Sequence, residues 1–171
     1  MSLVEDDLAP LGPDAAPATD ADHERFLGLV RALCAELDRP DTDAVIAAGR
    51  VEVQGFDVLL SHVENDAEAM YLQFDYGVTT AGRTLAIFRL MLESNLLVYA
   101  QDQAQLGLDP DTGSTQLVVR VPMTDDIDGR WLSDTLAHYA EHGRYWRDHL
   151  LQAPDEMFEA LSVGDWLWLR A

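Results

Sequence analysis

The sequence predicts an α+β fold, with an antiparallel five-stranded sheet and three helices in the order α-β-β-β-α-β-β-α. Apolar residues recur with the helical period in three long segments and alternate with polar residues in several short ones. Turn-forming residues separate the short segments, so neighbouring strands can pair as hairpins. The expected helices cover residues 20–38, 82–94 and 128–152, and the expected strands cover residues 51–54, 56–63, 70–76, 96–100 and 116–121.

The first helix is predicted by a stripe of apolar side chains with helical spacing. Asp20 or Asp22 can cap its start, and Arg39-Pro40-Asp41 ends it, because proline cannot continue the helical hydrogen bonds. Gly55 marks a tight turn between the first two strands, and Glu64-Asn65-Asp66 supplies the next hairpin turn. The apolar stripe of the first helix consists of Phe26, Leu29, Val30, Leu33 and Leu37, with Cys34 beside it as a small core residue.

The second helix is apolar on more than one side. One face carries large apolar side chains, and Ile87, Leu90 and Met91 fall largely on other faces. Such a helix must be buried on more than one side, and in so small a domain the sheet can cover only one. A second copy of the chain is the simplest cover for the rest. Ile87, Leu90 and Met91 are therefore predicted to form a dimer interface.

The last helix starts near Asp128, after a strand that ends at Pro122.

The chain is expected to divide into three parts. Residues 1–19 are rich in Ala, Pro and Asp and are expected to form a disordered lead. Residues 20–152 are expected to form one domain, and residues 153–171 a C-terminal extension that ends near Trp166-Leu167-Trp168-Leu169. The core stripe of the last helix is Leu132, Leu136, Tyr139, Gly143, Trp146 and Leu150.

The composition is strongly acidic, with 31 Asp and Glu against 11 Lys and Arg and a formal net charge of -20. This balance argues against nucleic acid or an anionic membrane surface as a partner, because both require clustered cations. Cys34 is the only cysteine, so an internal disulfide or a cysteine-rich zinc site is excluded. The acidic N-terminus does not resemble a signal peptide, and the best apolar stretch, residues 85–100, is interrupted by charges. We therefore expect a cytoplasmic protein.

The order of the elements and several residues resemble the class I type III secretion chaperones, the family of the Tir chaperone. The resemblance covers roughly residues 22–152 and is carried by the joint order of its parts, since none is specific alone. It departs from the family in the long lead and in the extension after residue 152. The matching residues are Asn95 closing the second helix, the strand Leu96-Leu97-Val98, Leu106-Gly107-Leu108-Asp109, Pro122-Met123 and Trp146.

The resemblance implies a cytoplasmic homodimer, joined mainly through the second helix, that binds a segment near the N-terminus of a secreted effector. The client segment would add to a sheet edge and place apolar anchors in shallow patches, without a nucleotide or other cofactor. No catalytic residue is implied. The positions that resemble the family's client-binding patches are Leu33, Leu37, Val51, Val53, Phe56 and Val58.

Two other functions compete with this interpretation. One is a zinc hydrolase, because the segment His138-Tyr139-Ala140-Glu141-His142 matches the H-x-x-E-H pattern. Few residues remain downstream for the further metal ligand. We therefore favour a structural role, in which these residues form a polar and aromatic flank of the last helix that packs against the tail or a partner. The other is an acidic immunity or inhibitor protein that masks a basic partner. It would need a concentrated acidic face without an apolar groove.

The segment Asp109–Gly113 resembles a calcium-binding loop, but Arg120 occupies the place of the bidentate glutamate. A hairpin turn is therefore predicted there.

Overall fold

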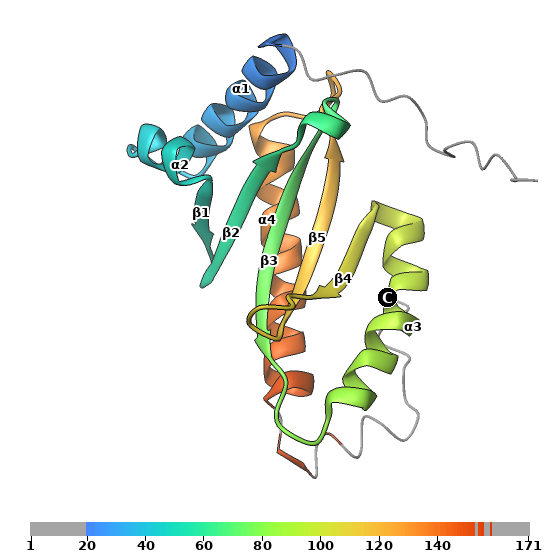
Figure 1. Ribbon diagram of the computed structural model, residues 1–171. Coiled ribbons are helices and arrows are strands. Elements are labelled where there is room, and N and C mark those ends of the chain that lie inside the picture. Colours follow the sequence, from blue (N-terminus) through green and yellow to red (C-terminus); the bar gives the residue numbers. More distant parts are fainter. Residues whose placement is uncertain (1–19, 153, 156–157, 159–171) are drawn as a thin grey trace, which may run out of the picture.

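The computed structural model describes residues 20–152 together with Pro154, Asp155 and Phe158. The sheet has five antiparallel strands in the order β1-β2-β3-β5-β4, so β1 and β4 are its two edges (Figure 1). The predicted α+β class and the antiparallel five-stranded sheet are confirmed. The strands are β1 (Arg50–Val53), β2 (Phe56–His62), β3 (Ala69–Val78), β4 (Ala104–Leu108) and β5 (Ser114–Pro122).

Within the described residues, four α-helices accompany this sheet. A 3-10 turn, η1 (Glu64–Asp66), joins β2 to β3, and a π-helical turn, η2 (Trp146–Leu151), continues the last helix. None of the helices in this part of the chain is long and apolar enough to cross a membrane. The helices are α1 (Asp20–Glu36), α2 (Thr42–Ala48), α3 (Thr84–Asp102) and α4 (Gly129–Tyr145).

The core lies between one face of the sheet and the helices behind it, of which α4 runs along the strands in Figure 1. Alternate residues of each strand point to this face, and the strand register aligns them in rows. Leu60, Leu72, Val119 and Ala104 form one such row across four strands, and each is at most 4% exposed. The predicted core stripe of the last helix is buried as well.

Two glycines allow α4 to lie close to its neighbours. A Cβ on Gly143 would lie 2.5 Å from a ring carbon of Tyr76 and 2.7 Å from one of Phe56. A Cβ on Gly129 would lie 2.4 Å from the backbone of Ala32 on α1. Only a residue without a side chain fits at such distances, so these glycines set the depth at which α4 packs.

The structure corrects two expectations for the secondary structure. Residues 96–100 are not a strand, because α3 continues to Asp102 and the fourth strand is β4. A short apolar run does not distinguish a strand from a buried helix segment, and here the helical pattern of the preceding residues continues. The short helix α2 was not expected; its sequence signal is Gly49, which ends it in the left-handed conformation with a φ of 61°.

Candidate partner-binding surfaces

The β4 edge of the sheet is blocked at its middle residue, Leu106, by a side chain of α3. The backbone N–H of Leu106 donates a hydrogen bond of 2.7 Å to Asn95 Oδ1, and Asn95 Nδ2 donates one of 3.0 Å to the Leu106 carbonyl. The amide thus occupies both outward-facing backbone groups of Leu106, as a neighbouring strand would. The sequence predicted that Asn95 closes this helix, and this is wrong: α3 continues to Asp102, so Asn95 lies well inside it.

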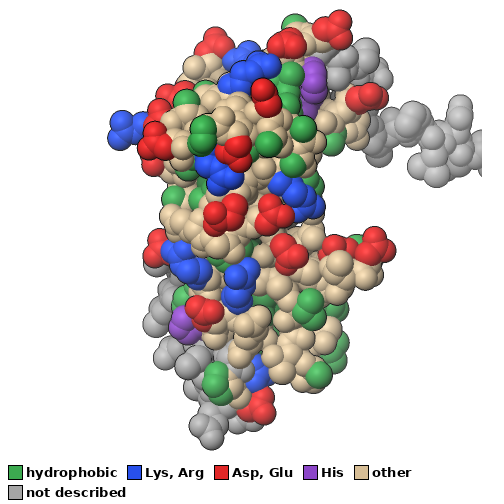
Figure 2. All heavy atoms as spheres, turned by 90° about the vertical axis from the view of Figure 1, so that its left-hand side faces the viewer, with side chains coloured by type: hydrophobic (Ala, Val, Ile, Leu, Met, Phe, Trp, Pro, Cys, Tyr) green, Lys and Arg blue, Asp and Glu red, His purple; other side chains and the backbone are tan. Residues whose placement is uncertain are grey.

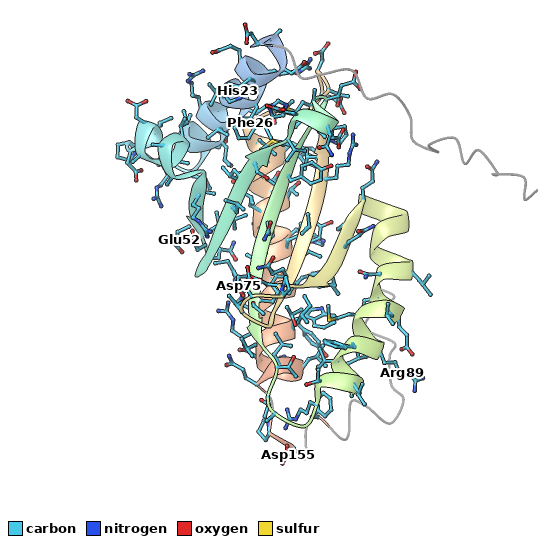
Figure 3. All side chains as sticks on the ribbon, in the orientation of Figure 1. His23, Phe26, Glu52, Asp75, Arg89 and Asp155 are labelled. Atoms are coloured by element: carbon cyan, nitrogen blue, oxygen red, sulfur yellow. The ribbon has the colours of Figure 1, made fainter. Side chains whose placement is uncertain are left out.

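The β1 edge has the opposite character. Gln54 and Gly55 form a two-residue turn with φ values of 51° and 86°, and Val53 pairs with Phe56 across it. In this register the backbone N–H and C=O groups of Arg50 and Glu52 point away from β2. Figure 3 shows Glu52 at this outer edge. The edge therefore presents hydrogen-bonding groups to which an extended chain can pair.

The six predicted client-binding residues lie close to this edge or beneath it. Leu33 belongs to α1, and the four strand residues belong to β1 and β2. Five of the six are at most 6% exposed, and only Leu37, just after α1, is half-buried. In the single chain these side chains mainly form core, so the surface that is free for a partner is the backbone edge beside them. The five buried residues are Leu33, Val51, Val53, Phe56 and Val58.

Helix α3 has two apolar faces, as expected, but they have opposite roles. Ile87, Leu90 and Met91 are 0, 2 and 6% exposed and belong to the core of the single chain. They therefore have little surface left to offer to a second copy. The outer face carries Leu85, Leu92 and Leu96, which are 85, 70 and 78% exposed. We call these three leucines the α3 stripe.

The exposed leucines form a narrow band. Spacings of seven and four residues place Leu85, Leu92 and Leu96 within about 40° of one another around the helix. The ion pair between Arg89 and Glu93, 2.7 Å long, lies beside the band on the same helix. Large apolar side chains exposed in a row are typical of a binding surface, so the α3 stripe is a candidate interface.

A hollow of about 460 Å³ lies between β5 and the first half of α4. Trp131, 40% exposed, and Tyr139 line it from the helix, and Val119 and Arg120 line it from the strand. The hollow combines apolar walls with charged groups at its rim, so it can accept one apolar side chain of a partner. The sequence signal for it is Trp131, a large aromatic residue that falls outside the core stripe of the last helix.

The histidines of the H-x-x-E-H segment lie on the exposed side of α4. The rings of His138 and His142 are 4.5 Å apart between centroids, and Glu141 is exposed beside them. In the part of the chain that the structure describes, no group of three or more His, Cys, Asp or Glu side chains is arranged to hold a metal ion. The geometry gives the zinc-hydrolase alternative no further support.

A charged network stabilises the outer face of the sheet. Arg120 donates two hydrogen bonds to the Asp66 carboxylate, 2.5 and 2.7 Å long, and the Tyr71 hydroxyl donates a third of 2.5 Å. The bonds from Arg120 are the main cause that holds the pKa of Asp66 below its usual range. Burial is the main cause that raises the pKa of Tyr71. The network ties η1 to β5 across β3 and has a structural role.

Cys34 is fully buried in the core, as the sequence predicts. Burial raises the pKa of its thiol, which keeps the group protonated and unreactive at neutral pH. The Asp109–Gly113 segment is the predicted hairpin turn. The Asp109 carboxylate accepts hydrogen bonds from the backbone N–H groups of Asp111 and Thr112 and so serves the turn itself.

The sequence matches the profile of the Tir chaperone protein (CesT) family over residues 29–147. This match spans all five strands, α3 and α4, including both sheet edges and the α3 stripe. The chain belongs to the Tir chaperone family, as the resemblance in the sequence predicted. A search of curated protein sequences found no significant match.

Solved structures share this fold. A chain from the crystal structure of the ExsC–ExsE complex matches with a TM-score of 0.59 and 20% identity, covering 80% of this chain and 100% of its own length. A chain from the structure of the HopA1–SchA chaperone–effector complex matches with a TM-score of 0.57 and 18% identity, covering 75% and 98% respectively. At these identities the comparisons establish the fold.

Proposed function

We propose that this protein is a cytoplasmic, non-enzymatic type III secretion chaperone that binds a segment near the N-terminus of a secreted effector and keeps it soluble. The observation that carries the proposal is the family match. The matched residues include both edge strands of the sheet, of which β4 is blocked at its middle and β1 is open. Asn95 occupies the backbone of β4 at Leu106, whereas the outward groups of Arg50 and Glu52 on β1 are available. The client strand therefore adds to β1.

The core beneath β1 supports such a strand. Val51 and Val53 point to the buried face of the sheet, so an added strand would continue the apolar layer between the sheet and the helices. Leu37, just after α1, is half-buried against the same core and leaves part of an apolar side chain exposed. Backbone hydrogen bonds alone do not offset the ordering entropy of a disordered client, so the client must bring apolar anchors.

The proposal includes a homodimer, in which the α3 stripe of one copy packs against the other. The chain's own core already buries Ile87, Leu90 and Met91, so the stripe on the outer face replaces them as the proposed interface.

The alternative function, an acidic inhibitor, would not need an exposed apolar stripe. On the side of the molecule that Figure 2 shows, arginines intermingle with Asp and Glu, so the charge there is not concentrated in one acidic face.

Co-expression with N-terminal segments of candidate effectors tests the proposal. We expect a stable complex of two copies of this chain with one client segment, measured by size-exclusion chromatography with light scattering. Glu52→Pro removes an outward N–H from β1 and is expected to abolish client capture. Glu52→Ala keeps the backbone and is the matched control.

Two results would contradict the proposal at different levels. If no effector segment is captured by the native chain, the secretion-chaperone function is wrong. If Glu52→Pro retains its circular dichroism spectrum and still captures the client as well as Glu52→Ala, the β1 edge is not the binding site.

A further inference from the structure

The α3 stripe lies next to the place where the chain leaves the described domain. Thr80, in the segment before α3, holds the end of η2 through two hydrogen bonds to the Leu151 carbonyl, one from its backbone N–H (3.0 Å) and one from its hydroxyl (2.7 Å). Because Leu85 follows Thr80 closely in the sequence, the end of η2 is held close to the first turn of α3. The C-terminal part of the chain therefore begins near the Leu85 end of the α3 stripe.

Arg83 attaches the next residues to the same point. Its guanidinium forms an ion pair with Asp155 and lies over the ring of Phe158, 4.6 Å from the ring centroid. Arg83 is 7% exposed and Phe158 is 8% exposed, so this contact is part of the packed structure. In Figure 3, Asp155 lies at the same end of the molecule as the start of α3, and Arg89 points outward from that helix.

The sequence after this anchor carries apolar side chains of its own. Residues 159–171 include Trp166-Leu167-Trp168-Leu169, four consecutive large apolar residues. An extended chain of ~3.3 Å per residue can reach about 33 Å from Phe158 to Trp168. The α3 stripe is only about 16 Å long at a helical rise of ~1.5 Å per residue. The segment can therefore reach every leucine of the stripe on its own molecule.

We propose that the segment Trp166–Leu169 docks on the α3 stripe of its own chain, formed by Leu85, Leu92 and Leu96, and competes there with a second copy. The competition rests on the proposed homodimer. Charge favours the segment as occupant: residues 159–171 contain Glu159 and Asp165 against Arg170, whereas a second copy brings a net charge of -20. Two such copies repel each other at low salt, which a covalently attached, nearly neutral segment avoids.

Engineered cysteines test the docking directly in the full-length chain. Leu92→Cys combined with Trp168→Cys is expected to form an intramolecular disulfide under mild oxidation, seen as a fast-migrating monomer on a non-reducing gel. Trp131→Cys combined with Trp168→Cys is the matched control, because Trp131 is also an exposed apolar residue but lies on α4. Cys34 remains in both variants, since it is fully buried.

Each result of this experiment decides the docking. An intramolecular disulfide that forms at least about tenfold faster with position 92 than with position 131 supports it. Equal rates would mean that the segment has no preferred surface, and a disulfide between two chains would mean that it docks on a neighbour. Either result, or the absence of any disulfide, would overturn the proposal.

Truncation after Ala160 tests the competition. Removing the segment is expected to lower the dissociation constant of the homodimer at least about tenfold at low salt, because the stripe is then free in every copy. An unchanged or higher dissociation constant would overturn the competition. If neither the full-length nor the truncated chain dimerises, the proposed homodimer fails, and the disulfide experiment still decides whether the segment docks.

Discussion

The side-chain amide of Asn95 on α3 hydrogen-bonds to both the N–H and the C=O of Leu106 on the edge strand β4. This pair links the helix to the sheet and blocks the middle of one of the two sheet edges. It also fixes which side of α3 faces inward. With Asn95 bound to β4, Ile87 and Leu90 are buried and Leu92 is left on the outside. One contact therefore contributes to both proposed surfaces.

Replacing Asn95 with alanine is expected to destabilise the fold. The backbone groups of Leu106 lose their partner, and a part-buried hydrogen-bonding group left unpaired costs about 1–3 kcal/mol. The measurement is the free energy of unfolding in urea. Gln105→Ala, at the exposed neighbouring position of β4, is the control and is expected to change stability by less than about 0.5 kcal/mol. Equal losses in the two variants would contradict the role given to Asn95.

Gly129→Ala is expected to lower stability by about 1–3 kcal/mol, because the added Cβ would overlap the backbone of Ala32, which cannot rotate away as a side chain could. Gly28→Ala provides the opposite expectation. Position 28 lies inside α1 and has open space around a Cβ, so alanine is expected to stabilise the helix by about 0.5–1 kcal/mol. Urea midpoints measure both, and a Gly129→Ala variant as stable as the native chain would contradict the close packing of α1 and α4.

Introducing a glutamate at either of two neighbouring positions of α3, 91 or 92, distinguishes the buried face of the helix from its exposed face. Leu92→Glu is expected to leave the chain folded and shift it to monomer, since Leu92 is 70% exposed. Met91→Glu buries an unpaired charge at a position that is 6% exposed, and is expected to destabilise the chain by about 3 kcal/mol or more. Light scattering reports the assembly and urea reports the stability. If Met91→Glu instead gives stable monomers, the dimer interface predicted from sequence at Ile87, Leu90 and Met91 is the better choice.

The acid side of the stability profile is expected to depend on Asp66. Its pKa is lower in the folded chain than in the unfolded one, mainly through Arg120. Folding therefore favours the carboxylate, and this stability is fully present above the unfolded pKa of about 3.9 and is lost as the pH falls through the lower folded value.

Asp66→Asn removes this titration. Its free energy of unfolding is expected to lie below that of the native chain by about 1–3 kcal/mol at neutral pH, with the gap closing at acid pH. Asp57→Asn is the control, because the ion pair between Asp57 and Arg50 is largely exposed and is expected to contribute little. A gap that stays constant with pH would contradict the assignment to Asp66.

Local patterns were sufficient to predict most of the elements. Alternation in β3 and the helical stripe of α4 are both confirmed, because each has one face in the core and one outside, and burial writes that period into the sequence. The family was suggested as well, by the resemblance of the element order and of particular residues to the Tir chaperone family. The segment at 96–100 was assigned to the wrong element because an apolar run has no period of its own.

The partner-binding surfaces could be predicted only in part. The sequence showed that α3 has apolar residues on more than one side, yet it could not show which side the chain's own core would cover. Leu85 and Ile87 are similar in hydrophobicity, but one is 85% exposed and the other is fully buried. Their difference arises from the position of α3 against β4, which depends on Asn95 and Leu106, eleven residues apart.

The sequence by itself determined the fold class, the core of the sheet and α4 and the buried state of Cys34, because these follow from periodicity and composition. It also carried the resemblance to the Tir chaperone family, in the order of the elements and in particular residues. The tertiary structure decided which sheet edge is open, which face of α3 is free and where the C-terminal segment starts. These depend on contacts between residues distant in the chain, such as Arg83 with Asp155, whose energy exists only once the elements have packed.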